Sequence, residues 1–158
     1  MEKQALIASM KASISEVLET MFFLPLEFVD GGEINEIISS ADGGVLACKL
    51  VFSGPFSGVS CFLIPVKVAK GMTANFLGQD AEVVTEEQMA GTVKEVLNMI
   101  TGKLFSLYNN RAVFNLGLPE TVPSDKWALL LTKDVKESVT LCVNTPDGDF
   151  GLMFLIFS

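Results

Sequence analysis

The stretch GPFSGVSCFLI, at Gly54–Ile64, leads from a turn of glycine, proline and serine directly into an apolar run of strand length. The apolar run Val45–Ser53 precedes it, so the two runs predict a β-hairpin joined by the turn. A similar stretch, PDGDFGLMFLI at Pro146–Ile156, again leads from a turn into an apolar strand. Two such turns predict two hairpins of antiparallel strands.

The helical parts of the sequence also show a weak repeat. EVLETM at Glu16–Met21 resembles EVLNMI at Glu95–Ile100, and both lie in long segments whose apolar residues recur at helical spacing. Each half, about 1–66 and 80–158, therefore predicts a helix followed by antiparallel strands. We interpret the chain as one pseudo-symmetric α+β domain, with two long helices packed on an antiparallel β-sheet. Chance similarity is the alternative, because Leu and Glu are common in helices.

The remaining elements are predicted from turn residues and apolar spacing. One long helix is expected over Glu2–Phe22, and the other opens after Thr85, a favoured N-cap, and ends near Tyr108. The stretch KVAKGMTANFLG predicts a shorter helix that is closed by Gly78. The other expected strands are Leu24–Val29, Glu33–Ser40, Val59–Val66, Ala112–Leu118, Trp127–Thr132, Ser138–Val143 and Phe150–Phe157.

Composition and the length of apolar runs restrict the class of protein. The 158 residues are 49% hydrophobic and 19% charged, which predicts one globular domain with a large core. No apolar run approaches the ~20 residues that cross a bilayer, and the N-terminus lacks the pattern of a signal peptide. Three scattered cysteines without CxxC spacing are typical of a reducing compartment. We therefore expect a cytoplasmic protein with no membrane partner.

Two absences in the composition restrict the chemistry. The sequence has no histidine, which excludes Ser-His and Cys-His nucleophilic sites and removes the commonest ligand of zinc and iron. The net charge is −8 and the 11 basic residues form no cluster, so no nucleic-acid partner is expected. We predict no metal site and no cofactor of the chain's own. Any catalysis has to use carboxylates, amides, hydroxyls or lysines.

The segment TVKEVLNMITGK, at Thr92–Lys103, carries the strongest candidate for a functional site. At about 100° per residue, Glu95 and Asn98 project from the same side of the helix, about 60° apart. An apolar stripe predicts the face toward the sheet: Met89, Val93, Val96, Leu97, Ile100, Leu104 and Leu107. The opposite side, which we expect to face solvent, contains Gln88, Gly91, Thr92, Glu95, Asn98, Met99 and Gly102.

Two glycines on this predicted solvent side favour a functional interpretation. Gly91 and Gly102 each cost about 1 kcal/mol relative to alanine in a helix interior. Without side chains, these positions leave room for the backbone of another protein to approach Glu95 and Asn98. An ordinary solvated helix face is the alternative, because Glu and Asn are exposed in most proteins.

The pattern ExxNMIxG at Glu95–Gly102, followed by LGLPETV with Pro119, resembles the signature of the chemotaxis phosphatases CheC, CheX and FliY. The stretches ISEVLETMFF and FSGPFSG resemble the CheX-like branch, which has a single catalytic site. The resemblance covers nearly the whole chain and implies a CheC-like fold. It also implies a phosphatase that hydrolyses the aspartyl phosphate of a response-regulator receiver domain, typically CheY, in chemotaxis or two-component signalling.

The resemblance implies a role for each residue of the motif. Asn98 would orient the attacking water, and Glu95 would pair with the active-site lysine of the receiver. The Mg²⁺ of the reaction would belong to the receiver, and the phosphatase would form a homodimer. Gly91, Thr92, Met99 and Gly102 would contact the partner, and Pro119 would support the motif.

The sequence departs from the family pattern in the helix. Asp or Ser is favoured four residues before the Glu, and this chain has Gly91 there. In the first repeat Glu19 replaces the amide, and we interpret Glu16 and Glu19 as non-catalytic because a carboxylate repels a phosphoryl group. The alternative function is a non-catalytic CheX-like binding module that docks on a signalling or flagellar-switch partner. A small-molecule enzyme has little support without histidine or a nucleotide loop.

Overall fold

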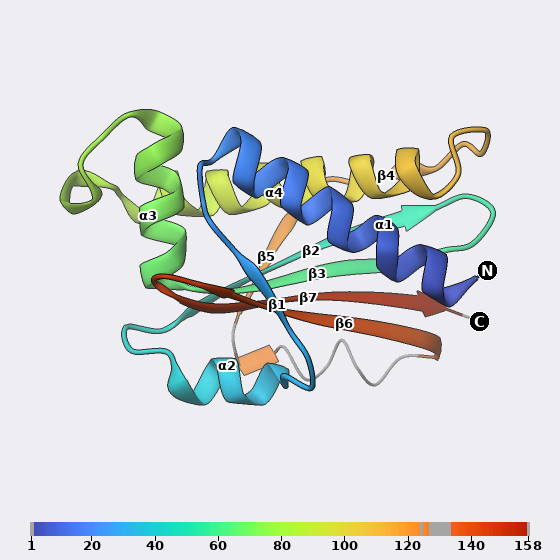
Figure 1. Cartoon of the computed structure of the whole chain (residues 1–158), viewed down its shortest axis with the longest axis horizontal. Coiled ribbons are helices and arrows are strands. Elements are labelled where there is room, and N and C mark those ends of the chain that lie inside the picture. Colours follow the sequence, from blue (N-terminus) through green and yellow to red (C-terminus); the bar gives the residue numbers. More distant parts are fainter. Residues whose placement is uncertain (1, 124, 127–133, 158) are drawn as a thin grey trace.

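Seven antiparallel strands form one sheet in the computed structural model, which describes residues 2–123, 125–126 and 134–157 (Figure 1). Their order is β1-β6-β7-β3-β2-β4, and β5 pairs with β2 further along the same edge as β4. The strand predicted over Trp127–Thr132 lies outside the described residues. The strands are β1 (Glu27–Val29), β2 (Val45–Ser53), β3 (Gly58–Pro65), β4 (Asn115–Leu116), β5 (Glu120–Val122), β6 (Val135–Thr145) and β7 (Gly148–Phe157).

Two hairpins supply the four central strands, as the sequence predicts. β2 pairs with β3, with Cys48 opposite Phe62, and β6 pairs with β7, with Val143 opposite Phe150. β3 and β7 then pair with each other at the centre of the sheet. Every residue of β3 is buried, because strands flank it on both sides and helices pack on both faces of the sheet.

The edge strands are exchanged between the two halves of the chain. β1 precedes the first hairpin but pairs with β6 of the second hairpin. β5 precedes the second hairpin but pairs with β2 of the first. Each half of the chain thus adds one edge strand to the other half, on either side of the central β3–β7 pair, as two similar halves would do. The internal repeat itself stays a prediction.

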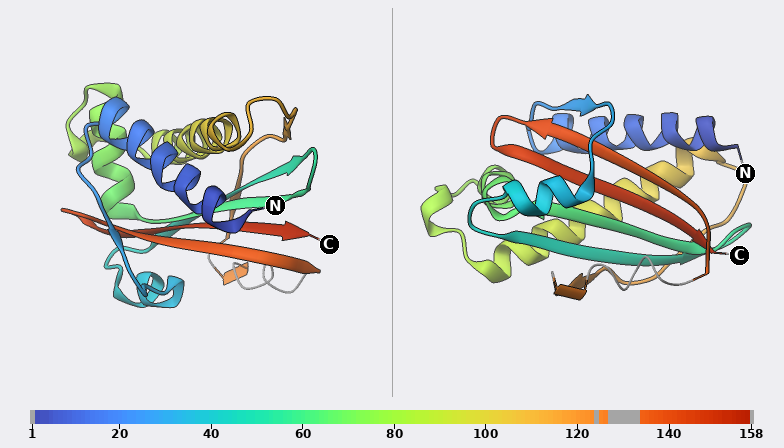
Figure 2. Two further views of the ribbon diagram at one scale, coloured as in Figure 1. Left: turned by 45° about the vertical axis from the view of Figure 1, so that its right-hand side comes forward. Right: turned by 90° about the horizontal axis from the view of Figure 1, so that it is seen from below.

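Helices cover both faces of the sheet, as Figure 2 shows. α1 (Lys3–Ser15) continues as the π-helix η1 (Glu16–Met21), which confirms the helix predicted over Glu2–Phe22, and it lies beside α4 (Glu86–Tyr108). α3 (Val66–Leu77) stands at one end of this pair and is capped by Gly78, whose φ of 65° is the left-handed conformation expected of a closing glycine. The other helices are α2 (Ile34–Ser40) on the opposite face and the 3-10 turn η2 (Ala81–Val83).

The hydrophobic core is divided by the sheet, and the larger part lies under α1, α3 and α4. The Phe52 and Phe154 rings stack there with their centroids 4.8 Å apart. The smaller cluster contains Ile37, Ala47, Val59, Cys61, Leu63, Cys142, Met153 and Leu155. The larger cluster determines which face of α4 is buried.

The prediction of a strand over Glu33–Ser40 is wrong, because most of these residues form helix α2. Ile34 and Ile37 lie three residues apart and pack over Gly151 of β7, where a Cβ would collide with the Ile34 side chain. Isoleucine favours strands by local propensity, which explains the error. Burial against the second face of the sheet selects the helix instead, because tertiary packing outweighs such propensities.

Candidate active site on helix α4

Helix α4 begins and ends where the sequence predicts. The Thr85 hydroxyl accepts a hydrogen bond from the Gln88 backbone N–H at 3.1 Å, and the Gln88 side chain accepts one from the Thr85 N–H at 3.0 Å. This capping box satisfies amide groups that have no partner within the helix. At the other end, the Asn109 N–H donates to the Phe105 carbonyl oxygen at 3.0 Å. The face between these ends is therefore carried by a well-defined helix.

Three sides of α4 make contacts with the rest of the fold. Thr101 Oγ1 and Ser60 Oγ of β3 are both buried and lie 2.9 Å apart in a hydrogen bond. On another side, Lys103 Nζ lies 3.0 Å from Glu16 Oε1 of η1. The third side packs on the sheet through the predicted stripe of Met89, Val93, Val96, Leu97, Ile100 and Leu104.

Glu95 and Asn98 lie on the remaining side of α4. Glu95 is exposed and Asn98 is part-buried. The two residues are about 60° apart around the helix axis and about 4.5 Å apart along it. Within the described residues, neither the Glu95 carboxylate nor the Asn98 carboxamide takes part in a hydrogen bond or an ion pair. A carboxylate acceptor and an amide that both donates and accepts are therefore available together to a ligand.

Gly91 and Gly102 flank this pair, and the packing of the chain requires glycine at neither position. A Cβ on Gly91 would have no heavy atom within 4 Å of it. A Cβ on Gly102 would lie 3.8 Å from Cδ1 of Leu116, which is an ordinary van der Waals distance. Alanine would therefore fit at both positions and favour the helix more. The glycines leave the helix surface bare without a benefit to the fold.

The structure corrects the predicted positions of other residues on α4. Thr92 is only 5% exposed, so the prediction that it faces solvent is wrong. It lies on the side of the helix that also carries Lys103, and the neighbouring α1–η1 helix covers that side. Met99 is part-buried and packs against the core. Leu107, predicted for the core, lies in the last turn of α4 and is 46% exposed.

The segment between β4 and β5 runs along strand β2 at the edge of the sheet. The Gly117 N–H donates to the Val51 carbonyl oxygen of β2 at 2.7 Å, and β5 then continues along β2. Between these two points, Leu118 is 86% exposed and Pro119 is part-buried. Proline restricts the backbone where the chain passes from one short strand to the next. Pro119 therefore lies in the connection between β4 and β5 and is not on α4 itself.

A pocket at the C-terminal end of α4 was not predicted from the sequence. It has a volume of about 250 Å³ and includes Gly102 in its lining. Its other wall comes from residues 112–116, which follow the helix in the chain and fold back beside it. No periodicity within α4 could indicate it, because the pocket requires both segments.

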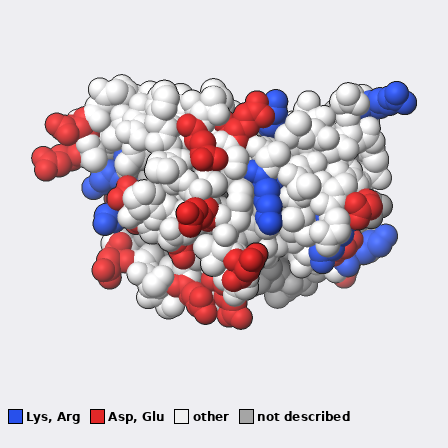
Figure 3. All heavy atoms as spheres, viewed as in Figure 1, with Lys and Arg blue, Asp and Glu red and all other residues white. Residues whose placement is uncertain are grey.

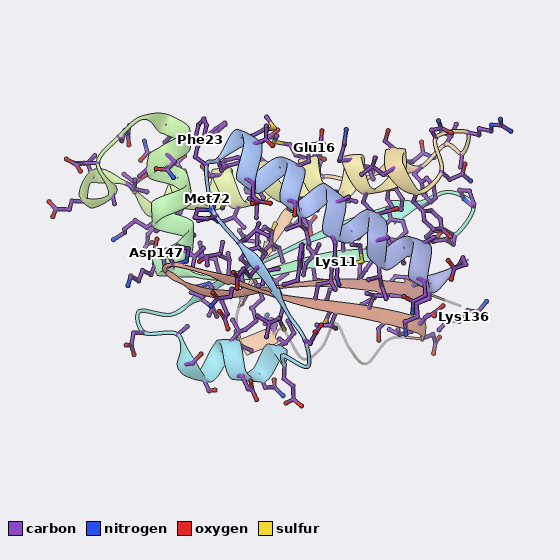
Figure 4. The ribbon with its side chains drawn as sticks, viewed as in Figure 1. Lys11, Glu16, Phe23, Met72, Lys136 and Asp147 are labelled. Carbon is purple, nitrogen blue, oxygen red and sulfur yellow. The ribbon has the colours of Figure 1, made fainter. Side chains whose placement is uncertain are left out.

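The first repeat does not present a matching pair of side chains. Glu16 and Glu19 are exposed on the π-helix η1, and Glu16 is engaged by Lys103. Figure 4 shows Glu16 near the top of the view and Lys11, which belongs to α1, lower down toward the sheet. Lys11 Nζ lies 5.6 Å from the centroid of the Phe28 ring of β1. Glu16 and Lys11 of the first repeat thus make contacts within the fold.

Other kinds of chemistry find little support in the part of the chain that the structure describes. Within it, no group of three or more acidic or thiol side chains could hold a metal ion, and no helix is long and apolar enough to span a membrane. Burial raises the pKa of the Cys48 and Cys61 thiols to about 12, so both stay protonated near neutral pH. Figure 3 shows acidic groups gathered along the edge formed by α2, with basic side chains more scattered.

The antiparallel sheet with two long helices on one face is a CheC-like α+β fold. The chain belongs to the CheX family, because the sequence model described as chemotaxis phosphatase CheX matches residues 46–142. No curated protein sequence matches the chain significantly.

Crystal structures of related proteins share this fold over nearly their whole length. The chemotaxis protein CheX from Vibrio vulnificus matches with a TM-score of 0.73 and 17% identity, over 96% of this chain and 95% of that one. A chain of the CheX–CheY–BeF3–Mg²⁺ complex from Borrelia burgdorferi matches with a TM-score of 0.71 and 17% identity, over 96% and 97%. A chemotactic CheC-like protein from Shewanella oneidensis matches with a TM-score of 0.72 and 17% identity, over 98% and 99%.

Proposed function

We propose that this chain is a phosphatase that hydrolyses the aspartyl phosphate of a CheY-type receiver domain. The observation that carries the proposal is the Glu95–Asn98 pair, which has no partner among the described residues and stands on a helix face left bare by Gly91 and Gly102. Membership of the CheX family of chemotaxis phosphatases supports it. The shared fold with a chain of the CheX–CheY–BeF3–Mg²⁺ complex supports a receiver as the partner.

The proposed reaction is the attack of water on phosphorus. The bond from phosphorus to the aspartyl oxygen breaks, and inorganic phosphate and the free aspartate carboxylate are formed, while a water proton passes to phosphate or solvent. An acyl phosphate has a good leaving group, so the position of the water matters more than a strong base. The Asn98 carboxamide can accept one hydrogen bond from the water and donate another. It thereby holds the water in line with the bond that breaks.

Glu95 docks the receiver in this mechanism. Its exposed carboxylate pairs with the active-site lysine of the receiver through a charge-assisted hydrogen bond. The Mg²⁺ is held by the receiver, and the phosphatase supplies no metal ligand. Gly91, Met99 and Gly102 lie against the partner, whereas Thr92 is buried and does not contact it.

The family resemblance also leads us to propose a homodimer. No second chain is needed to form the Glu95–Asn98 pair, because both residues stand on one helix. Light scattering on the purified protein tests this proposal. It should give twice the mass of the chain, and a mass equal to one chain would contradict it.

A non-catalytic binding module is the second candidate function. Gly91 occupies the position where the family pattern favours Asp or Ser, so the helix face of this chain lacks one polar group. In that case the same face of α4 docks a signalling or flagellar-switch partner. The lifetime of the phosphoryl group on any receiver would then be unchanged.

Phosphate release from phosphorylated receivers separates the two candidates. CheY-type receivers of the host are phosphorylated with a small-molecule phosphodonor, freed of the donor and mixed with the protein in the presence of Mg²⁺. At least one receiver should lose phosphate faster than it does alone, at a rate that rises with the concentration of the protein. Binding of a receiver without faster release would establish the binding module instead.

A further inference from the structure

A pocket of about 250 Å³ opens on α4 next to the Glu95–Asn98 pair. Gly102 belongs both to the lining of this pocket and to the bare helix face. Because Gly102 has no side chain, nothing at that position separates the pocket from the face. The other residues that shape it are Phe105, Ser106, Ala112, Phe114 and Leu116.

The pocket lies in the direction in which the Glu95–Asn98 pair points. Gly102 and Asn109 both line the pocket. At about 100° per residue around the helix axis, their positions lie within about 10° of the direction midway between Glu95 and Asn98. Along the axis, Gly102 follows Asn98 by about 6 Å. A protein surface that lies on the Glu95–Asn98 pair and extends along α4 therefore also covers the pocket.

The lining combines an apolar wall with a polar rim. The Phe105 and Phe114 rings stack with centroids 3.9 Å apart and planes 6° apart, and Leu116 lies beside Gly102. The polar groups come from Ser106, Asn109 and Asn110, which are exposed. The volume is below the roughly 300 Å³ at which small-molecule sites begin. A single side chain with its backbone at the polar rim fits these properties.

We propose that this pocket receives one apolar or aromatic side chain of the receiver domain and thereby selects among receivers. The proposal rests on the proposed docking of a receiver on α4, but not on hydrolysis. The side chain would protrude from the receiver beside its phosphorylation site, because the pocket starts about one helical turn from Asn98. Receivers that carry a charged residue at that position would bind more weakly, since the Phe105 and Phe114 rings would exclude water from the charge and the polar groups at the rim are neutral.

Two substitutions fill the pocket from opposite walls. Ser106→Leu closes it from the exposed surface of α4, and Ala112→Leu closes it from the segment that folds back. Neither residue belongs to the Glu95–Asn98 pair. Ala41→Leu is the matched control, because Ala41 is also part-buried and lies at the end of α2 on the other face of the sheet. Circular dichroism and thermal unfolding establish that each variant is folded.

Binding of a CheY-type receiver loaded with BeF3 and Mg²⁺ is measured by calorimetry, and phosphate release is measured in parallel. Ser106→Leu and Ala112→Leu should each raise Kd and KM on the order of tenfold, since burial of an apolar side chain is lost, and leave kcat unchanged. Ala41→Leu should change none of these values. A Kd within twofold of the original protein for both pocket variants would overturn the proposal.

The outcomes for the pocket and for the phosphatase are distinguishable. If the original protein binds the loaded receiver but releases no phosphate, hydrolysis fails while the Kd values still decide the pocket. If it hydrolyses normally and the pocket variants match it, the pocket alone fails. If it binds no receiver, both fail.

A double-mutant test identifies the receiver side chain that enters the pocket. Apolar receiver residues around the phosphorylation site are replaced by alanine one at a time. At least one of these replacements should weaken binding to the original protein but not to the Ser106→Leu variant, as expected for a direct contact.

Discussion

The hydroxyl groups of Ser60 and Thr101 share a buried hydrogen bond of 2.9 Å, which joins β3 at the centre of the sheet to α4. Thr101 follows Asn98 by three residues, less than one turn of the helix. The contact therefore fixes the rotation of the helix close to the proposed catalytic amide. The exposed site depends on this buried contact, because an amide that orients water has to be held in a defined direction.

Removal of one partner from this contact should destabilise the protein. Thr101→Val leaves the buried Ser60 hydroxyl without a hydrogen bond, so the free energy of unfolding should fall by about 1–3 kcal/mol. Urea denaturation measures the change. The double variant Ser60→Ala, Thr101→Val leaves no unpaired hydroxyl and should recover much of the loss. A double variant no more stable than Thr101→Val alone would contradict this account of the contact.

The glycine at position 91 should be replaceable without harm to the fold. Gly91→Ala should raise the free energy of unfolding by about 0.5–1 kcal/mol, because alanine favours the helix and has open space there. Gly91→Leu should also fold, but its side chain should obstruct the receiver and raise KM for the phosphorylated form. Ala90→Gly, one position earlier in the same helix, is the control and should be destabilising. Destabilisation by Gly91→Ala would mean that the fold itself requires the glycine.

The Glu16–Lys103 ion pair should matter little for either stability or hydrolysis. Both side chains are substantially exposed, so Glu16→Gln should reduce the free energy of unfolding by less than about 1 kcal/mol, and less still at high salt. Phosphate release should stay at the original rate, since we interpret the first repeat as non-catalytic. A large fall in kcat with a folded protein would instead assign Glu16 to the reaction.

The buried thiols predict a loss of stability at alkaline pH. The pKa of Cys48 and Cys61 is raised by burial to about 12 in the folded chain, from an ordinary value of 9.0. Between these two values the unfolded state loses protons that the folded state keeps, so stability is fully present below about pH 9 and falls as pH rises toward 12. Urea denaturation from pH 7 to 11 measures this dependence. A variant with Cys48→Ala and Cys61→Ala should show a shallower fall, and an identical slope would contradict the assignment.

Much of the fold could be predicted because local and tertiary preferences agree there. The Thr85 cap, the apolar stripe of α4 and the turn at Gly54 each act over a few residues, and the structure has the expected helix and hairpin at these places. Glu33–Ser40 is different, since its isoleucines favour a strand locally and the helix arises from packing over Gly151. No pattern within that segment shows that the far face of the sheet needs a cover.

The candidate site could be predicted in its centre but not at its borders. The spacing of Glu95 and Asn98 places them on one side of a helix whatever lies beneath it. The burial of Thr92 depends on the neighbouring α1–η1 helix, which the sequence of α4 does not contain. The pocket beside Gly102 depends in the same way on Phe114, from a segment that folds back. Borders of a site are made by tertiary contacts, and those follow from the fold.

Glu95 and Asn98 should affect different kinetic constants. Glu95→Gln keeps the shape of the side chain but removes the charge that pairs with the receiver's lysine, so it should mainly raise KM for the phosphorylated receiver. Thermal unfolding should be unchanged, since the carboxylate has no partner among the described residues. This variant is the matched control for the change at Asn98.

The rate of phosphate release by Asn98→Ala at saturating phosphorylated receiver is the most direct test of the central claim. The substitution removes the group that positions the water, so kcat should fall on the order of 100-fold while the receiver is still bound. An unchanged kcat in a folded Asn98→Ala variant would contradict the mechanism.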